Sequence, residues 1–539
     1  MQKFTSYALL VTLLGVLGAC QKYEPMPVNF EKKQTKPSQN TDDLDPNSPK
    51  GKPDDTDPED PVVPKDEIKD NPTPSPDPKK EEPVKPDPKI PDEPTKPAFS
   101  LTVEAEDARL TGLTVSQAVQ NFSGKGYVTG FDADSDSLDL DFEVPRAGAY
   151  QIRIGYAAGL GDKETDIVIN NEAGPKIKLT DSKVFATTSL GRLLLKQGKN
   201  TITVKKGWGY YDIDYFKIEE TSISFDTKSI PNVIVTPNAT PAALKLWTYL
   251  KSEFGKHMIS GQVNVQGDEG DYIKRETGKT PAMGGFDLLH YTSVSYNQGQ
   301  GNGEVERAID WYKNRNGIVT FVWHWFSPSG QKGEKFFYTS DTDFDVERAV
   351  TAGTRENREV IADMKAIGDQ LERLKNAGVP ILWRPLHEAE GKWFWWGAKG
   401  PEACKKLYAM LFNYLANERK LTNLIWVWNS VDPAWYPGNA TVDIVSTDIY
   451  HNKATDDPNV TQFEALRELT KGQKIVSLAE NDAIPDPSKM KALGAYWSWF
   501  NTWGGEFILS EKYNSKAKLK ALYNSEYVIT LDELPVLNK

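Results

Sequence analysis

Apolar residues follow two different patterns in the folded part of the chain. From about residue 240 to residue 539, short apolar runs alternate with segments whose apolar residues recur every three to four positions. Continuous apolar runs are typical of strands buried on both faces of a parallel sheet, and the longer spacing is typical of amphipathic helices. The expected strands are residues 258–263, 281–287, 318–325, 380–388, 423–429, 442–450, 474–482 and 495–501. The expected helices are residues 242–256, 304–316, 356–377, 401–419, 462–470, 488–493 and 515–524.

This alternation predicts a (β/α)8 TIM barrel for residues 240–539, because eight strand–helix units fit into roughly 300 residues. In that fold the active site forms at the carboxyl ends of the strands. Residues 221–239 are interpreted as the connection to the domain before it.

Residues 99–220 follow a pattern of period two instead. Apolar and polar residues alternate over short runs, and turn residues such as the Asn170-Asn171 pair separate them. The expected strands are residues 101–106, 137–144, 149–156, 166–170, 191–195, 200–204 and 211–218. Several short strands at this spacing predict an all-β sandwich.

Residues 20–98 show neither pattern. Residues 21–98 hold 19 of the 35 prolines, mixed with Asp, Glu and Lys, and have no apolar periodicity with which to build a core. We expect a disordered linker with extended polyproline-II segments of about 3.1 Å per residue.

The first 19 residues are interpreted as a signal peptide. Lys3 gives a positive start, residues 8–17 are apolar, and the run is too short to span a bilayer as a mature helix. The sequence Leu17-Gly18-Ala19-Cys20 resembles a bacterial lipobox, which implies cleavage before Cys20 and lipidation of that residue. The expected location is then the bacterial outer membrane, with the protein facing outside the cell. The alternative is an ordinary secretory peptide with a Cys near its cleavage site.

Composition narrows the classes of function. The net charge is −12 and no basic tract stands out, which argues against a nucleic-acid partner. A Gly-rich phosphate loop is absent from the sequence, which argues against a sugar-nucleotide or cofactor enzyme, so no catalytic cofactor is expected. With Cys20 lipidated, Cys404 has no partner and a disulfide is not expected. The 15 Trp residues are concentrated in the second half, as expected for carbohydrate binding.

Residues 381–397 combine an apolar strand with chemically active side chains. Arg384, His387 and Glu388 lie at the end of the expected strand, and Trp393, Trp395 and Trp396 follow in a loop. Such a set suits a sugar, whose C–H faces stack on indole rings and whose hydroxyls need hydrogen bonds. The alternative is a core strand with an Arg–Glu ion pair and packing tryptophans.

Two glutamates occupy strand ends on opposite sides of the expected barrel mouth, Glu388 on the fourth strand and Glu480 on the seventh. A pair of carboxylates facing a Trp-lined cleft is what glycoside hydrolysis needs. One stays protonated to donate to the leaving oxygen, and the other stays ionised to attack the anomeric carbon. Other polar or aromatic residues expected at strand ends are His324, Trp325, Trp428, Asn429, Asp448, Tyr450, Trp497 and Trp499.

The barrel sequence resembles glycoside hydrolase family 26. The resemblance rests on residues 384–388 (RPLHE), 391–397 (GKWFWWG), 435–438 (WYPG) and 442–450 (VDIVSTDIY). It implies a retaining endo-β-1,4-mannanase with Glu388 as general acid/base and Glu480 as nucleophile. His387 and Tyr450 would orient the nucleophile, with Arg384 in support. Sugar contacts would come from His324, Trp325, Trp393, Trp396, Asn429 and Trp499.

One departure from the family pattern concerns Phe500, which stands where several mannanases have an Arg after the last sugar-contacting Trp. It suggests a weaker distal subsite on the glycone side and leaves endo and mannobiose-releasing exo action both open. The expected partner is mannan, galactomannan or glucomannan, bound by a monomer. The alternatives are action on β-1,3-xylan or mixed-linkage β-glucan, and a surface glycan-binding lipoprotein without activity.

The preceding domain resembles carbohydrate-binding module family 35. Residues 103–108 (VEAEDA), 124–128 (GKGYV), 198–202 (GKNTI) and 212–216 (DIDYF) carry the resemblance. It implies a structural calcium ion held by Glu104, Glu106 and Asp214, whose oxygens are hard ligands. The alternative is a solvated strand face. Trp208 and Tyr210 are candidates for sugar stacking, whereas core packing is at least as good an explanation for Tyr211.

Overall fold

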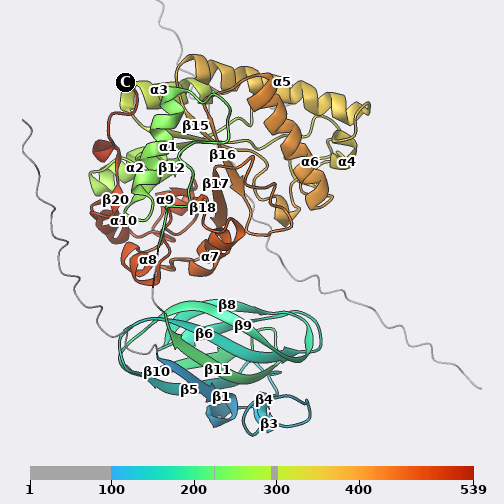
Figure 1. Ribbon diagram of the computed structural model, residues 1–539, viewed down its shortest axis with the longest axis vertical. Helices are drawn as coiled ribbons and strands as arrows, with labels where there is room; N and C mark the ends of the chain where they lie inside the picture. Colours follow the sequence, from blue (N-terminus) through green and yellow to red (C-terminus); the bar gives the residue numbers. More distant parts are fainter. Residues whose placement is uncertain (1–98, 222, 224, 293–300) are drawn as a thin grey trace, which may run out of the picture. The chain divides into compact units, whose positions relative to one another are not determined.

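The computed structural model describes residues 99–221, 223, 225–292 and 301–539 (Figure 1). The expected signal peptide, the lipidated Cys20 and the Pro-rich linker therefore lie outside the described residues. In the part of the chain that is described, no helix is long and apolar enough to cross a membrane.

The first described domain is a β-sandwich, as predicted. One sheet has the strand order β3-β4-β11-β6-β9, with β1 beside β11, and the other has the order β2-β5-β10-β7-β8. The strands are β1 Ser100–Glu104, β2 Arg109–Thr111, β3 Thr114–Ser116, β4 Tyr127–Thr129, β5 Ser137–Val144, β6 Gly148–Ala158, β7 Lys163–Ile169, β8 Glu172–Leu179, β9 Ser182–Leu195, β10 Gly198–Lys205 and β11 Asp212–Glu220.

Alternation of side chains explains this core. In β5, Leu138, Leu140, Phe142 and Val144 are buried, and the polar residues between them are more exposed. Successive side chains of a strand point to opposite faces, so one face joins the core and the other meets solvent. The short strands β2, β3 and β4 were not predicted, because three residues give too little alternation to recognise.

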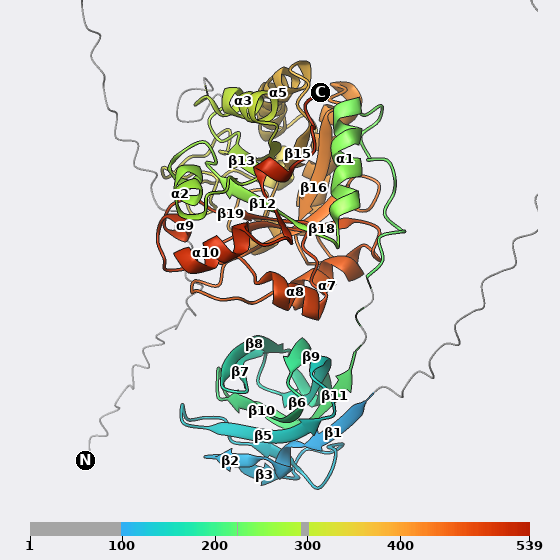
Figure 2. The same cartoon turned by 90° about the vertical axis from the view of Figure 1, so that its left-hand side faces the viewer.

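The second domain is a (β/α)8 barrel, which confirms the predicted fold class (Figures 1 and 2). Seven parallel strands follow in the order β13 to β19, and β12 is the eighth, which closes the ring by pairing with both β13 and β19. The strands are β12 Met258–Val263, β13 Met283–Asp287, β14 Ile318–Val322, β15 Ile381–Arg384, β16 Leu424–Asn429, β17 Ile444–Ile449, β18 Ile475–Asn481 and β19 Trp499–Thr502. A short ninth strand, β20 (Val528–Ile529), pairs with the start of β12.

Helices surround these strands, and Figure 2 shows α1 alongside β16. They are α1 Pro241–Glu253, α2 Asp268–Thr277, α3 Glu304–Arg315, α4 Val346–Ala349, α5 Arg355–Asn376, α6 Pro401–Phe412, α7 Val460–Leu469, α8 Pro487–Leu493, α9 Glu506–Leu509 and α10 Lys516–Tyr523. The expected helix 401–419 is α6 continued by one π-helical segment, Asn413–Glu418.

Several features of the barrel were not predicted correctly. The short elements α4, α9 and β20 were not expected, and the expected strands 318–325 and 380–388 end earlier, at Val322 and Arg384. Helix α2 was missed because its sequence is mostly polar, with Tyr272 and Ile273 among its few buried apolar residues. The last strand begins at Trp499 rather than Ala495, and its final residue Thr502 pairs with Asn481 of β18. The mouth of the barrel at this strand is therefore formed by residues after Thr502.

Candidate active site

The turn after β15 places the first catalytic candidate. Leu386 and Glu388 both adopt left-handed backbone conformations, with φ of 53° and 52°, which is uncommon for residues other than Gly. The chain reverses sharply there, and the backbone N–H of Glu388 donates to Asn429 Oδ1 at 2.9 Å. Asn429 was predicted to contact sugar, but it is buried and holds this turn instead.

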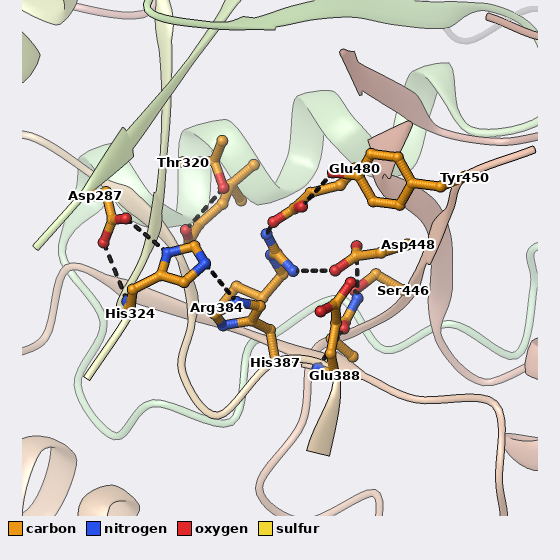
Figure 3. A network of polar contacts seen from close by, with 12 residues as sticks. Asp287, Thr320, His324, Arg384, His387, Glu388, Ser446, Asp448, Tyr450 and Glu480 are labelled. Atoms are coloured by element: carbon orange, nitrogen blue, oxygen red, sulfur yellow. Dashed lines mark hydrogen bonds and ion pairs between the residues drawn. The ribbon is translucent and has the colours of Figure 1, made fainter. Parts of the chain in front are cut away.

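Three carboxylates from three strand ends meet in the barrel mouth (Figure 3). One oxygen each of Glu388, Asp448 and Glu480 lies within 4.8 Å of the other two. Arg384 donates to Asp448 Oδ2 at 2.7 Å and to Glu480 Oε1, so its guanidinium balances negative charge in the cluster. Asn429 Nδ2 donates to Asp448 Oδ1 at 2.9 Å, which links Asp448 to the turn that carries Glu388.

Glu480 is surrounded by donors. Arg384 donates to one of its oxygens, and the Tyr450 hydroxyl donates to the other at 2.7 Å. Hydrogen bonds from charged and neutral donors favour the ionised form of a carboxylate. Arg384 and Tyr450, which were predicted to support Glu480, both contact it.

Glu388 has the opposite surroundings. Burial, followed by the nearby Asp448 and Glu480 carboxylates, raises the pKa of Glu388 well above its ordinary value. The indole N–H of Trp393, which donates to Glu388 Oε2 at 3.0 Å, opposes this effect but does not outweigh it. A carboxyl group with a raised pKa keeps its proton to a higher pH and can donate it to a leaving group.

His387 was predicted to contact Glu480, but its Nε2 contacts His324 instead. Its Nε2 lies 3.2 Å from His324 Nε2, and Asp287 Oδ2 lies 2.7 Å from His324 Nδ1. The side chain of His387 thus faces the end of β14, while Arg384 takes the place beside Glu480.

Three tryptophans predicted as sugar contacts have no exposed face. Trp325, Trp396 and Trp499 are each at most 1% exposed. The Trp325 indole donates to Asp363 at 2.8 Å, and the Trp396 indole donates to the backbone of His387 at 2.9 Å. A buried ring cannot stack on a sugar, so these residues pack the walls behind the cleft.

Trp393 and Trp503 are the tryptophans available to a ligand at this site. Trp393 is 45% exposed, as its predicted role requires. Trp503 follows the end of β19, is partly exposed, and its ring centroid lies 5.8 Å from that of His324. Phe500 is fully buried, so its own side chain does not line the cleft.

Sequence reasoning missed the roles of Asp287, Asp448 and Trp503. All three lie at or directly after a strand end, which is the signal that could have found them. Asp448 was noted at its strand end without a role, because the sequence does not tell that its carboxylate joins Glu388 and Glu480. Trp503 was missed because the last strand was placed too early.

The expected calcium ligands of the sandwich gather around one loop. Ser123 donates from its backbone to Asp214 Oδ1 at 2.9 Å and from its hydroxyl to Glu104 Oε1 at 2.8 Å. Lys125 N–H donates to Glu106 Oε1 at 2.6 Å. The remaining oxygens, Glu104 Oε2 and Glu106 Oε2, are buried and lack a hydrogen-bond partner among the described residues.

The carboxylates of Glu104, Glu106 and Asp214 suit a cation, although their oxygens do not all lie close together. Burial, with smaller effects of Glu104 and Glu106, raises the pKa of Asp214 to about 6. Buried carboxylate oxygens without donors are costly unless a cation or a proton neutralises them. Among the described residues, only the cluster around Glu388 has three acidic side chains with oxygens within 4.8 Å of one another, so the Asp214 set is more widely spaced.

The aromatic residues of the sandwich differ in exposure. Trp208 and Tyr210 are 67% and 58% exposed, which leaves their rings available for stacking. Tyr211 is buried and stacks on Phe131, with ring centroids 4.5 Å apart, so it belongs to the core.

A (β/α)8 barrel with one glutamate after its fourth strand and another at the end of its seventh, in a mouth bordered by accessible tryptophans, is typical of a glycoside hydrolase. Known proteins agree with this class. The sequence profile of glycosyl hydrolase family 26 matches residues 235–533, and that of carbohydrate binding module family 35 matches residues 101–221. The chain belongs to glycosyl hydrolase family 26 and carries a family 35 module ahead of its catalytic barrel.

Several relatives match most of the chain. A mannan endo-1,4-beta-mannosidase of Thermothelomyces thermophilus is 41% identical over 440 residues, covering 80% of this chain and 90% of that protein. The crystal structure of a GH26-CBM35 β-(1,4)-mannanase of Podospora anserina is also 41% identical, covering 82% of this chain and 99% of that chain, with a TM-score of 0.60. A ruminal GH26 endo-β-1,4-mannanase is 32% identical with the same coverage and a TM-score of 0.64.

Proposed function

We propose that this protein is a retaining endo-β-1,4-mannanase that cleaves mannan, galactomannan or glucomannan. The names of the relatives support the substrate class. The close approach of Glu388 and Glu480, with oxygens within 4.8 Å, carries the mechanism. Retaining enzymes hold their two carboxyl groups about 5–5.5 Å apart, whereas inverting enzymes leave roughly 6.5–9.5 Å for a water molecule.

The first step forms a covalent intermediate. Glu480 attacks the anomeric carbon of the sugar while Glu388 donates its proton to the glycosidic oxygen, whose bond to that carbon breaks. The products are a shortened chain with a new hydroxyl group and a glycosyl ester on Glu480. The Tyr450 and Arg384 donors hold the Glu480 carboxylate in place before attack.

The second step releases the sugar. Glu388, now ionised, takes a proton from a water molecule as the water oxygen attacks the anomeric carbon, and Glu480 leaves as a carboxylate. Two inversions at one carbon restore its configuration. The raised pKa of Glu388 suits both roles, since the group gives up a proton in one step and regains it in the next.

Substrate preference is tested by the products that the enzyme releases. We expect new reducing ends and mixed-length oligosaccharides from galactomannan and glucomannan, and little release from lichenan or β-1,3-xylan. Mannobiose as the sole early product would indicate exo action instead of endo action. Faster release from lichenan or xylan would contradict the proposed substrate class, and failure to release reducing ends from any of them would favour a glycan-binding protein.

The sandwich is proposed to bind calcium through Glu104, Glu106 and Asp214. A cation that binds only the folded module stabilises it, so chelation should lower the melting temperature of its transition by several degrees. Calorimetry of the full chain with and without chelator measures this shift. The matched control is the E104Q/E106Q double variant, whose melting curve should not respond to chelator. Identical curves for the unaltered protein in both conditions would rule out a stabilising ion.

The lipid anchor remains a proposal that rests on residues 17–20 alone, with the Pro-rich segment as a tether between the membrane and the enzyme. Cys20→Ala should move the enzyme from the membrane fraction to the soluble or secreted fraction, because the acylated thiol is lost. Cys404→Ala is the control, since that thiol is buried in α6. Retention of the Cys20→Ala protein in the membrane fraction would contradict the anchor.

A further inference from the structure

Asp287 makes close contact with a residue of the cleft without being part of the carboxylate cluster. It is the last residue of β13, opposite Val322 of β14. Its Oδ1 accepts the backbone N–H of His324 at 3.1 Å, and its Oδ2 lies 2.7 Å from the ring Nδ1 of the same residue. Because a carboxylate only accepts, the ring Nδ1 carries a hydrogen and the direction of the His324 ring is fixed.

The other nitrogen of the His324 ring faces a second histidine (Figure 3). His324 Nε2 and His387 Nε2 are 3.2 Å apart, with the rings nearly perpendicular at 76°. One hydrogen must lie between these two nitrogens for the contact to be attractive. Among the described residues, His387 Nδ1 has no hydrogen-bond partner, and it is buried.

We propose that Asp287 is a positioning residue for glycoside hydrolysis, which holds His324 as an imidazolium that donates its Nε2–H to a neutral His387. This role rests on the proposed function, since it concerns the same cleft and takes Glu480 as the nucleophile. Asp287, Arg384 and Trp503 line one small cavity of the barrel mouth, which places Asp287 beside the cleft.

Charge around the two rings favours a proton on His324. Burial opposes a charge there, but Asp287 and the more distant Glu480 outweigh it and raise the pKa of His324. Burial, His324 and Arg384 all lower the pKa of His387. The pKa is thus higher for His324 than for His387, and the hydrogen between the two rings is bonded to His324, which Asp287 contacts.

The other neighbours of the two histidine rings do not reverse this order of pKa values. Phe337, Phe394 and Trp503 contact the His324 ring and carry no charge. The charged groups that act on the two rings are Asp287, Arg384 and Glu480. Asp287 in turn acts on His290 and Glu304. The imidazolium adds a second positive charge that interacts with Glu480, and it fixes the hydrogen of His387 on Nδ1.

The test is nitrogen NMR of the full chain labelled at its histidines, of which the sequence has only five. At neutral pH we expect one ring with both nitrogens protonated, assigned to His324 by its loss in H324Q. In D287N this ring should become neutral and titrate at least about one pH unit lower, because the opposite charge is gone. The matched control is E253Q, which removes the carboxylate partner 2.7 Å from His257 at the surface and should alter the His257 signals alone.

Activity gives a second readout. D287N should lower kcat/KM by about 10-fold or more. The alkaline limb of the pH profile of kcat/KM should also shift to lower pH, because His324 then loses its proton at a lower pH. D287E should recover much of the lost activity. A neutral His324 in the unaltered protein, or a protonation state unchanged in D287N, would overturn the proposal. The NMR measurement needs no substrate, so its result does not depend on whether the protein is a mannanase.

Discussion

Glu480→Ala and Glu388→Ala should both inactivate the enzyme on mannan, but they should differ on substrates with activated leaving groups. Removing the nucleophile prevents the covalent intermediate, so Glu480→Ala should lose at least about 10⁴-fold in kcat on every substrate. Removing Glu388 takes away the proton donor, which a dinitrophenolate leaving group does not need. The first step then survives in Glu388→Ala, and the glycosyl-enzyme accumulates because water has no base to activate it.

Azide separates the two roles. It attacks the glycosyl ester without base assistance, so it should restore turnover of a dinitrophenyl mannoside in Glu388→Ala and yield a glycosyl azide. The azide formed by Glu388→Ala should have the β configuration. In Glu480→Ala, azide should give no β-glycosyl azide. Glu402→Ala, a surface substitution at the start of α6, is the matched control and should retain full activity. Azide rescue in Glu480→Ala with a β-azide product, and none in Glu388→Ala, would reverse the assignment.

Arg384→Met should be among the most destabilising single substitutions in the barrel. Arg384 is 4% exposed and pairs with Asp448 and Glu480, whose side chains are 2% and 5% exposed. Its removal leaves two buried carboxylates without their counter-charge, and breaking a buried ion pair typically costs about 3–5 kcal/mol. Activity should fall as well, since Glu480 loses the donor that holds it. Thermal unfolding and mannan hydrolysis measure the two effects.

The pH dependence of Arg384→Met identifies the cause. Burial already raises the pKa of Asp448, with Arg384 opposing the rise, and the variant raises it further. A carboxyl group with a raised pKa in the folded state takes up a proton on folding, so the variant should regain stability as pH falls from about 7 towards 4. Arg419→Met is the control, because Arg419 pairs with Asp369 and Glu372, which are more exposed. Equal and pH-independent losses in both variants would contradict a special role of Arg384.

The sequence predicted the fold well where apolar runs coincide with strands. Strand β12 was placed correctly to the residue, and β18 within one residue at each end, because their buried faces leave continuous apolar runs. The last strand was misplaced because Ala495 and Trp497 are buried while forming a turn, in which Trp497 N–H donates to Ala495 O at 3.1 Å. Burial alone does not distinguish a strand from a buried turn.

The site was predicted in part, for a similar reason. Glu388 and Glu480 could be found because a carboxylate at the end of an apolar strand has few structural explanations. The tryptophans could not be sorted, because the exposed Trp393 and the buried Trp396 lie three residues apart in one loop, and only the direction of each side chain decides which faces the cleft. The Asp287–His324–His387 chain joins residues of β13, the end of β14 and the turn after β15, and pairing of this kind is not visible in a single sequence.

The stereochemistry of hydrolysis tests the central claim most directly. Proton NMR of an early reaction on a mannooligosaccharide resolves the anomers of the newly formed reducing end before they interconvert. A double displacement on Glu480 predicts that the β-anomer appears first and the α-anomer grows in later by mutarotation. The α-anomer appearing first would mean a single displacement by water and would contradict Glu480 as the nucleophile and Glu388 as the acid/base.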